Sequence, residues 1–228
     1  MKNALTRLAC LGEWIYARTF AQQCIGHAQR QVRVDLFSDW IENNSSVANA
    51  AEINSMAYAN SDRTFIQEQT ENRSWLQCDK PDVLFMDNFS ELVDKRFAHS
   101  SGYDFCATYG EFEAQQLMSA LDRCVLTDHG LLAIDSIYNE YDRFFNIIKN
   151  KWDIPIVFCH FPTKFDGREI YKKQGRVIIQ AIEMMSRKYD IQSIIADDNA
   201  IIMKDGWHYH FADQTVDNMA SKINVRFK

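Results

Sequence analysis

The chain has 228 residues, of which 46% are hydrophobic, and this is enough apolar material for one sizeable core. Its formal net charge of −6 argues against a nucleic-acid partner, because phosphate backbones require clustered Lys and Arg. No run of about 18 apolar residues occurs, so we expect no membrane span.

The N-terminal segment and the cysteines indicate where the protein resides. Residues 1–12 lack an apolar stretch followed by a small-residue cleavage site, and they predict a first strand rather than a signal peptide. The 6 cysteines form no Cys-x-x-Cys pair, and several lie in apolar runs. We therefore expect reduced, buried thiols in a cytoplasmic protein, with no zinc or other metal site and no cofactor.

Five short apolar runs, rich in β-branched residues, predict strands along the chain. They are Arg7–Leu11, Val32–Phe37, Asp82–Met86, Ile154–Cys159 and Ser193–Ala196. Three longer segments have apolar residues at the spacing of a helix, and they are Phe112–Val125, Ile134–Trp152 and Gln174–Tyr189. The polar stretch 38–72 is consistent either with helices over the sheet edge or with a mobile cap.

Apolar strands that alternate with helices are typical of a parallel sheet covered on both faces. We therefore expect one α/β domain over residues 1–228, with a mostly parallel five-stranded sheet. In such sheets, ligands bind at the carboxyl ends of the strands. The loops that follow Leu11, Met86, Cys159 and Ala196 are then the places to look for a site.

Two of these loops contain residues suited to binding an oxyanion. Gly12 follows the first predicted strand, where a glycine permits a sharp turn and the next amides begin a helix. The alternative is a tight turn without a ligand. Asn88 follows the third predicted strand and has an amide that donates hydrogen bonds. Equally, Asp87 or Asn88 caps a helix that begins at Phe89.

The loop after the fourth predicted strand carries His160 and Lys164. Basic residues at this end of a strand are suited to an anionic or sugar substrate. The alternatives are a satisfied buried histidine at position 160 and a simple turn in which Asp166 caps the next helix.

Near the C-terminus, Asp205 and His208 are separated by two residues. This spacing lets one loop present a carboxylate beside an imidazole, so that the carboxylate orients the ring and the ring acts as a general base. Such a motif is also common in solvated turns.

In their order along the chain, these motifs resemble those of the SGNH/GDSL hydrolase superfamily. The chain is most similar to uncharacterised SGNH-like proteins of bacterial capsule and surface-polysaccharide gene clusters. Their first block reads Gly-Ser-Cys-x-Ser-Arg-Asp-x-Phe, and their late block reads Asp-x-x-His-Tyr. The segments that match are Gly12 with Phe20, the loop 161–166, and Asp205 with His208 and Tyr209.

The resemblance implies a three-layer, flavodoxin-like α/β fold and assigns roles to several residues. His208 matches the general base, Asp205 the acid that orients it, and Gly12 and Asn88 the oxyanion-hole positions. The nucleophilic serine has no counterpart, because this chain has Glu13 there, or Trp14 in the alternative register. A carboxylate is a poor substitute, since its acyl product would be an anhydride.

By this resemblance, the expected substrate is a carbohydrate or glycan, with hydrolysis or transfer at an acyl group or linkage. Three hypotheses remain open because the serine is missing. The protein binds a glycan or a polysaccharide-biosynthesis protein without catalysis. Alternatively, Glu13 or His208 activates water or a sugar hydroxyl directly. In the third, a different hydroxyl, such as that of Thr19, reaches the site, although Thr19 lies about two helical turns past Gly12.

Overall fold

The computed structural model describes residues 1–9, 11–30, 32–43, 69, 78–100, 102–108, 124–126, 131–205 and 210–224. In chain order, its elements are β1 (Lys2–Leu8), α1 (Leu11–Thr19), β2 (Cys24–Arg30), α2 (Val34–Asn43), β3 (Val83–Asp87), α5 (Phe89–Val93), β4 (Asp94–His99), β5 (Asp104–Thr108), β6 (Cys124–Leu126), α7 (Ile137–Lys151), β7 (Ile156–Cys159), α8 (Glu169–Tyr189), β8 (Ile191–Ile194), the 3-10 helix η4 (Asp198–Ala200) and α9 (Asp213–Ser221).

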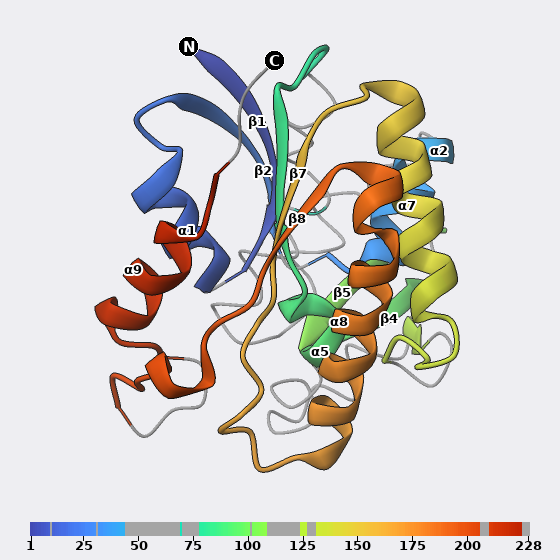
Figure 1. Cartoon of the computed structure of the whole chain (residues 1–228). Helices are drawn as coiled ribbons and strands as arrows, with labels where there is room; N and C mark the ends of the chain where they lie inside the picture. The colour runs from blue at the N-terminus through green and yellow to red at the C-terminus, as the bar shows by residue number, and fades with distance from the viewer. Residues whose placement is uncertain are drawn as a thin grey trace.

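Five strands form one all-parallel sheet in the order β2-β1-β3-β7-β8. Helices α1 and α9 cover one face of this sheet, and α2, α7 and α8 cover the other (Figure 1). The three layers and the strand order are consistent with a flavodoxin-like fold. The α/β class and the five-stranded parallel sheet expected from the sequence are confirmed.

The core lies where the apolar patterns are strongest. All residues of β3 are buried, which suits a central strand with helices on both sides. Helix α7 buries one face, and its buried residues follow helical spacing; they are Ile137, Tyr141, Phe144, Phe145 and Ile148. The predicted helices 134–152 and 174–189 are confirmed as α7 and α8, and α8 begins five residues earlier, at Glu169.

The first strand lies earlier than the sequence pattern predicted. The predicted strand Arg7–Leu11 is wrong in its bounds, because β1 spans Lys2–Leu8 and α1 begins at Leu11. Gly12 therefore lies inside a helix rather than at the end of a strand. Arg7 belongs to both the predicted and the observed strand, and its side chain is only 2% exposed although buried charges are unusual.

The second predicted strand, Val32–Phe37, is also wrong. Its last four residues begin α2, and the second strand is β2, which precedes this segment. Strand β2 is an edge strand with the polar sequence Cys-Ile-Gly-His-Ala-Gln-Arg, so apolar content did not mark it. The apolar residues Val34, Phe37 and Ile41 are spaced as on one helix face.

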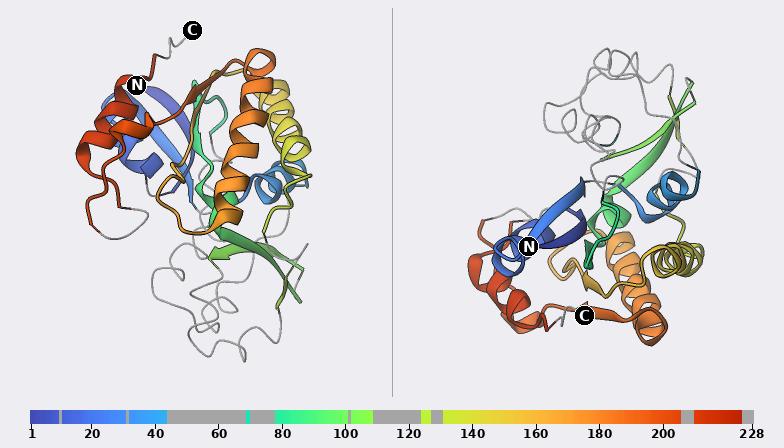
Figure 2. Two further views of the ribbon diagram at one scale, coloured as in Figure 1. Left: turned by 60° about the horizontal axis from the view of Figure 1, so that its bottom comes forward. Right: turned by 90° about the horizontal axis from the view of Figure 1, so that it is seen from above.

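A second, three-stranded antiparallel sheet was not predicted. Its order is β5-β4-β6, and it extends away from the five-stranded sheet (Figure 2). Cys124 and Val125, the last residues of the predicted helix Phe112–Val125, lie in β6 instead. The rest of that segment, residues 112–123, lies outside the described residues. Of the stretch 38–72, the structure describes 38–43, within α2, and residue 69.

Within the described part of the chain, no helix is both long enough and apolar enough to cross a bilayer.

The buried residue Glu91 on α5 connects four other elements through its carboxylate and its backbone carbonyl. Oε1 of Glu91 pairs with the Arg7 guanidinium of β1 and accepts the Val34 backbone N–H at 2.7 Å. Its Oε2 accepts the Tyr141 hydroxyl of α7 at 3.0 Å. The Glu91 carbonyl accepts Nε2 of Gln174 in α8 at 2.8 Å. Because both charges are almost fully buried, each compensates the other and cannot be removed alone without a large cost.

We predict that Glu91→Gln lowers the free energy of unfolding by about 3–5 kcal/mol, because it leaves the Arg7 charge buried without its counterion. Tyr141→Phe, which removes one neutral donor to the same carboxylate, should cost only about 1–2 kcal/mol. Urea unfolding of both variants measures the difference. Equal losses would mean that the Arg7–Glu91 pair does not hold these elements together.

Candidate functional site

The carboxyl ends of the strands meet at one edge of the sheet, the lower edge in Figure 1. The chain leaves β1 through α1 toward β2 on one side, whereas β3 pairs with β1 on the other. This reversal is the switch point at which doubly wound sheets bind ligands. The described residues that occupy this edge come from the segments that follow β1, β3, β7 and β8.

Asp87, the last residue of β3, connects two of these segments. Its Oδ2 accepts the Ala9 backbone N–H at 2.8 Å, and its Oδ1 accepts the Phe89 N–H at 3.1 Å. The second bond caps α5, as one of the two sequence alternatives proposed. Burial raises the pKa of the Asp87 carboxyl to about 7. The group is therefore a buried acid that titrates near neutrality.

Gly12 is adjacent to the same carboxyl group. A Cβ at position 12 would lie 2.2 Å from Oδ2 of Asp87, so only glycine permits this approach. The Gly12 N–H donates to the Ala9 carbonyl at 2.9 Å. The glycine signal in the sequence thus has a physical cause in close packing, whereas an oxyanion role for Gly12 stays a prediction.

Asn88 does not cap α5, since its side chain makes no capping bond. Instead, its Oδ1 accepts the Phe161 backbone N–H at 2.6 Å. Its Nδ2 is buried and finds no hydrogen-bond partner among the described residues. A buried donor without a partner costs about 1–3 kcal/mol, and such groups often serve a ligand. Asn88 is therefore an oriented amide donor at the switch point.

Glu13, which stands where the resemblance expects a serine, lies in the first turn of α1. It is partly buried, and a carboxylate at a helix N-terminus is favourable because of the helix dipole. Trp14, the residue in the alternative register, is 39% exposed. Thr19 donates its hydroxyl to the Ile15 carbonyl at 2.8 Å, within α1.

The late loop brings a different histidine to Asp205. Oδ2 of Asp205 contacts Nδ1 of His210 at 2.8 Å, and both side chains are exposed. His208 lies outside the described residues, so its predicted role as base stays a prediction. The signal for His210 was present in the segment His208-Tyr209-His210, which contains a second imidazole two residues later.

Aromatic rings anchor this loop beside Asn88. Met203 and Phe211 form an isolated antiparallel bridge at the base of the loop. The Phe211 ring packs edge-to-face against Phe161 at 5.3 Å, and Phe161 packs against Phe89 at 4.8 Å between ring centroids. Because Phe161 also bonds to Asn88, the base of the loop lies at the carboxyl edge of the sheet.

His160 and Lys164 lie in the segment that follows β7. Nε2 of His160 contacts Oγ of Ser193 at 2.9 Å, and Nδ1 has no partner among the described residues. Burial lowers the pKa of His160 to about 3, so the ring is neutral near pH 7. Lys164 donates its Nζ to the Asp198 carbonyl at 2.6 Å. Asp166 accepts the Arg168 N–H at 2.9 Å just before α8.

The structure thus brings Gly12, Asp87 and Asn88 together at the switch point, with His160 and Lys164 on the neighbouring strand end. Asp205 pairs with His210. Among the described residues, no group of three or more His, Cys, Asp or Glu side chains is placed to hold a metal ion.

Comparison with protein-family models, with curated proteins and with solved structures found no match to this chain.

The titration of Asp87 generates a prediction about stability and pH. The pKa of about 7 lies above the ~3.9 of an unfolded aspartate. The folded protein therefore keeps a proton that the unfolded chain releases. This stabilisation is complete below about pH 4 and is lost as the pH rises through about 7.

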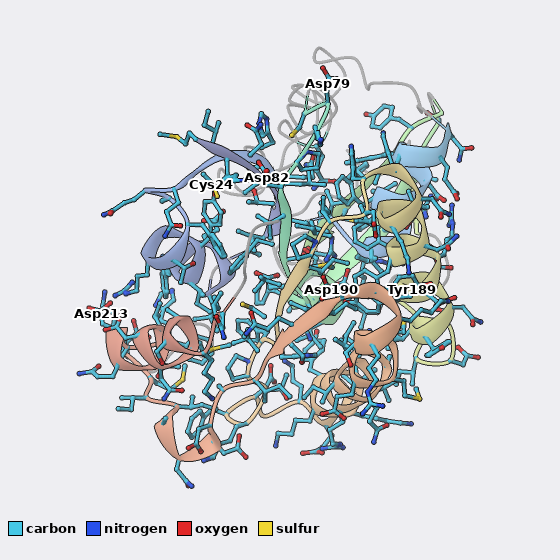
Figure 3. The ribbon with its side chains drawn as sticks, turned by 45° about the horizontal axis from the view of Figure 1, so that its top comes forward. Cys24, Asp79, Asp82, Tyr189, Asp190 and Asp213 are labelled. Atoms are coloured by element: carbon cyan, nitrogen blue, oxygen red, sulfur yellow. The ribbon has the colours of Figure 1, made fainter. Side chains whose placement is uncertain are left out.

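We expect the difference in unfolding free energy between the wild type and Asp87→Asn to shrink as the pH rises from 5 to 8. Asp82→Asn is the control at the opposite, amino edge of the sheet (Figure 3). Burial opposes ionisation of Asp82, but the Asn3 N–H and Lys2 together lower its pKa. The difference in unfolding free energy between the wild type and Asp82→Asn should therefore stay constant from pH 5 to 8. Urea unfolding measures both differences. A difference for Asp87→Asn that does not change with pH would contradict the raised pKa of Asp87.

Proposed function

We propose that the protein is SGNH-hydrolase-like, is related to surface-polysaccharide biosynthesis or modification, and acts on an acyl group or linkage of a carbohydrate. The observation that supports this most is the amide of Asn88. Its Oδ1 is fixed by Phe161, while its buried Nδ2 has no partner among the described residues. A donor held in this way at the switch point is suited to stabilise an oxyanion. The sequence motifs support the substrate class.

The simplest reaction that needs no serine is the direct attack of water. A general base removes one proton from water as the water oxygen bonds to the acyl carbon. The carbonyl oxygen becomes negative, and the Asn88 Nδ2–H donates to it. The bond from carbon to the sugar oxygen then breaks, and the sugar oxygen takes the proton back from the base. The products are a carboxylic acid and a sugar hydroxyl.

Two groups are candidates for the base. The Asp205–His210 pair is an imidazole held by a carboxylate at 2.8 Å, on the loop anchored next to Phe161. Glu13 lies in the first turn of α1, close in sequence to Gly12. His208, the base that the resemblance implies, remains a third candidate from the sequence.

The start of α1 leaves one further residue type to test as a nucleophile, although the resemblance gives the serine no counterpart. The segment between β1 and α1 consists of residues 9 and 10, so Glu13 lies beyond it, inside the helix. Residue 10 is a cysteine in the sequence and lies outside the described residues. A thiol forms acyl intermediates, whereas a carboxylate does so poorly. Cys10→Ala and Glu13→Gln, compared in one assay, distinguish a covalent route from base-assisted attack of water.

The matched variants for the proposed oxyanion role of Asn88 are Asn88→Ala and Asn88→Asp. The aspartate keeps an oxygen for the Phe161 N–H but lacks the Nδ2 donor. We expect both variants to lower kcat on an O-acetylated sugar by about 10²–10³, the usual cost of one oxyanion donor. Asn146→Ala, on the exposed face of α7, should leave kcat unchanged. Full activity in Asn88→Asp would assign Asn88 a purely structural role.

A second candidate function is binding without catalysis, and the carboxylate at position 13 favours it, since the family has a serine there. In this case the wild type hydrolyses no acetyl ester faster than buffer does. An oligosaccharide should then raise the melting temperature of the wild type. Absence of both turnover and stabilisation would overturn both candidate functions.

A further inference from the structure

A pocket of about 280 Å³ lies at the carboxyl ends of β7 and β8, against helix α8. Three segments form its wall: the loop after β7, the loop after β8 and one face of the helix. The polar and charged lining residues are His160, Thr163, Lys164, Lys172, Arg176 and Asp198. Its volume is just below the range of drug-sized ligand pockets, which begins at about 300 Å³.

The charge of this pocket is opposite to that of the whole chain. Three cations, Lys164, Lys172 and Arg176, line it in a protein whose net charge is −6. Asp198 is the single acidic residue among the lining residues. Lys172 also pairs with Glu169 at 3.1 Å, but Glu169 is 77% exposed, and such a pair exchanges readily with other anions.

The helical residues of the wall share one face of α8. Lys172, Gly175, Arg176 and Ile179 follow the spacing i, i+3, i+4, i+7, so both cations point to the same side. Gly175 permits the loop to approach this face, because a Cβ there would lie 3.1 Å from Cγ2 of Thr163. The two cations and the closely packed Gly175 thus lie on the same two turns of α8.

His160 provides the observation that points independently to a ligand. It is 2% exposed and lines the pocket, and its Nδ1 has no partner among the described residues. Ser193 contacts the other ring nitrogen at 2.9 Å, so the hydroxyl can donate there and leave the Nδ1–H as a donor. A buried donor of this kind is stabilised when a ligand oxygen accepts its hydrogen bond.

We propose that this pocket binds the phosphate group of a phosphorylated small molecule the size of a sugar phosphate. Two lysines and the planar fork of Arg176 line the pocket, and such cationic donors suit a tetrahedral dianion. Phosphate binding here is independent of the acyl chemistry proposed above, since it does not require Asn88 to stabilise an oxyanion.

Calorimetric titration with inorganic phosphate, glucose 1-phosphate and glucose tests the proposal on the full chain. We expect saturable binding of the two phosphate-bearing probes and none of neutral glucose. Arg176→Gln and Lys172→Gln should each raise Kd by about tenfold, which corresponds to 1.4 kcal/mol. Lys173→Gln removes the same charge from an exposed position of α8 that does not line the pocket, and Kd should change by less than about twofold, because distant charges are screened.

Three results would overturn the proposal: no saturable binding of either phosphate-bearing probe, equal affinity for glucose and glucose 1-phosphate, or an equal effect of Lys173→Gln and Arg176→Gln. Melting temperatures of the variants confirm that each folds. A separate readout is the ¹⁵N chemical shift of the His160 ring, which should change on saturation with phosphate. Phosphate binding without esterase activity would leave this proposal standing and refute the enzymatic one.

Discussion

The burial of the Glu91 carboxylate is the constraint on which the rest of the structure depends. A charge without solvent must be paired, and Glu91 is paired with Arg7 while it also accepts bonds from Val34 and Tyr141. These contacts fix β1, the start of α2 and helix α7 relative to α5. Asn88 directly precedes α5, so the same constraint positions the amide that the proposed chemistry uses.

The carboxyl edge of the sheet is organised by the segment that follows β7. The backbone N–H of Phe161 orients Asn88, and the Phe161 ring supports the loop of Asp205 through Phe211. The neighbouring residues of this segment, from His160 to Lys164, line the basic pocket. One short segment thus connects the proposed oxyanion donor with the proposed phosphate site. A substrate that carries both an acyl group and a phosphate is consistent with this arrangement.

The sequence predicted the elements whose apolar pattern reflects local burial, such as β3, α7 and α8. It placed β1 too late, since the strand begins at the polar residues Lys2 and Asn3, and it could not show that Arg7 is paired with a carboxylate 84 residues away. It overlooked β2, since an edge strand tolerates polar residues. At the carboxyl edge, the sequence predicted oxyanion positions at Gly12 and Asn88, but the orientation of the Asn88 amide and the pairing of Asp205 with His210 depend on tertiary contacts. The sequence indicated His160 and Lys164 as suited to an anionic substrate, but it did not indicate that Lys172 and Arg176 of α8 line the same pocket.

We expect ligands to bind at the carboxyl edge of the sheet. NMR titration with an O-acetylated glucose 1-phosphate tests it most directly, because the shifts are resolved by residue. We expect saturable changes in the Asn88 side-chain amide, in the backbone amides of Phe161, Thr163 and Lys164, and in the His160 ring. Changes confined to the amino edge, around the second cavity lined by Tyr189 and Asp190, would contradict it (Figure 3).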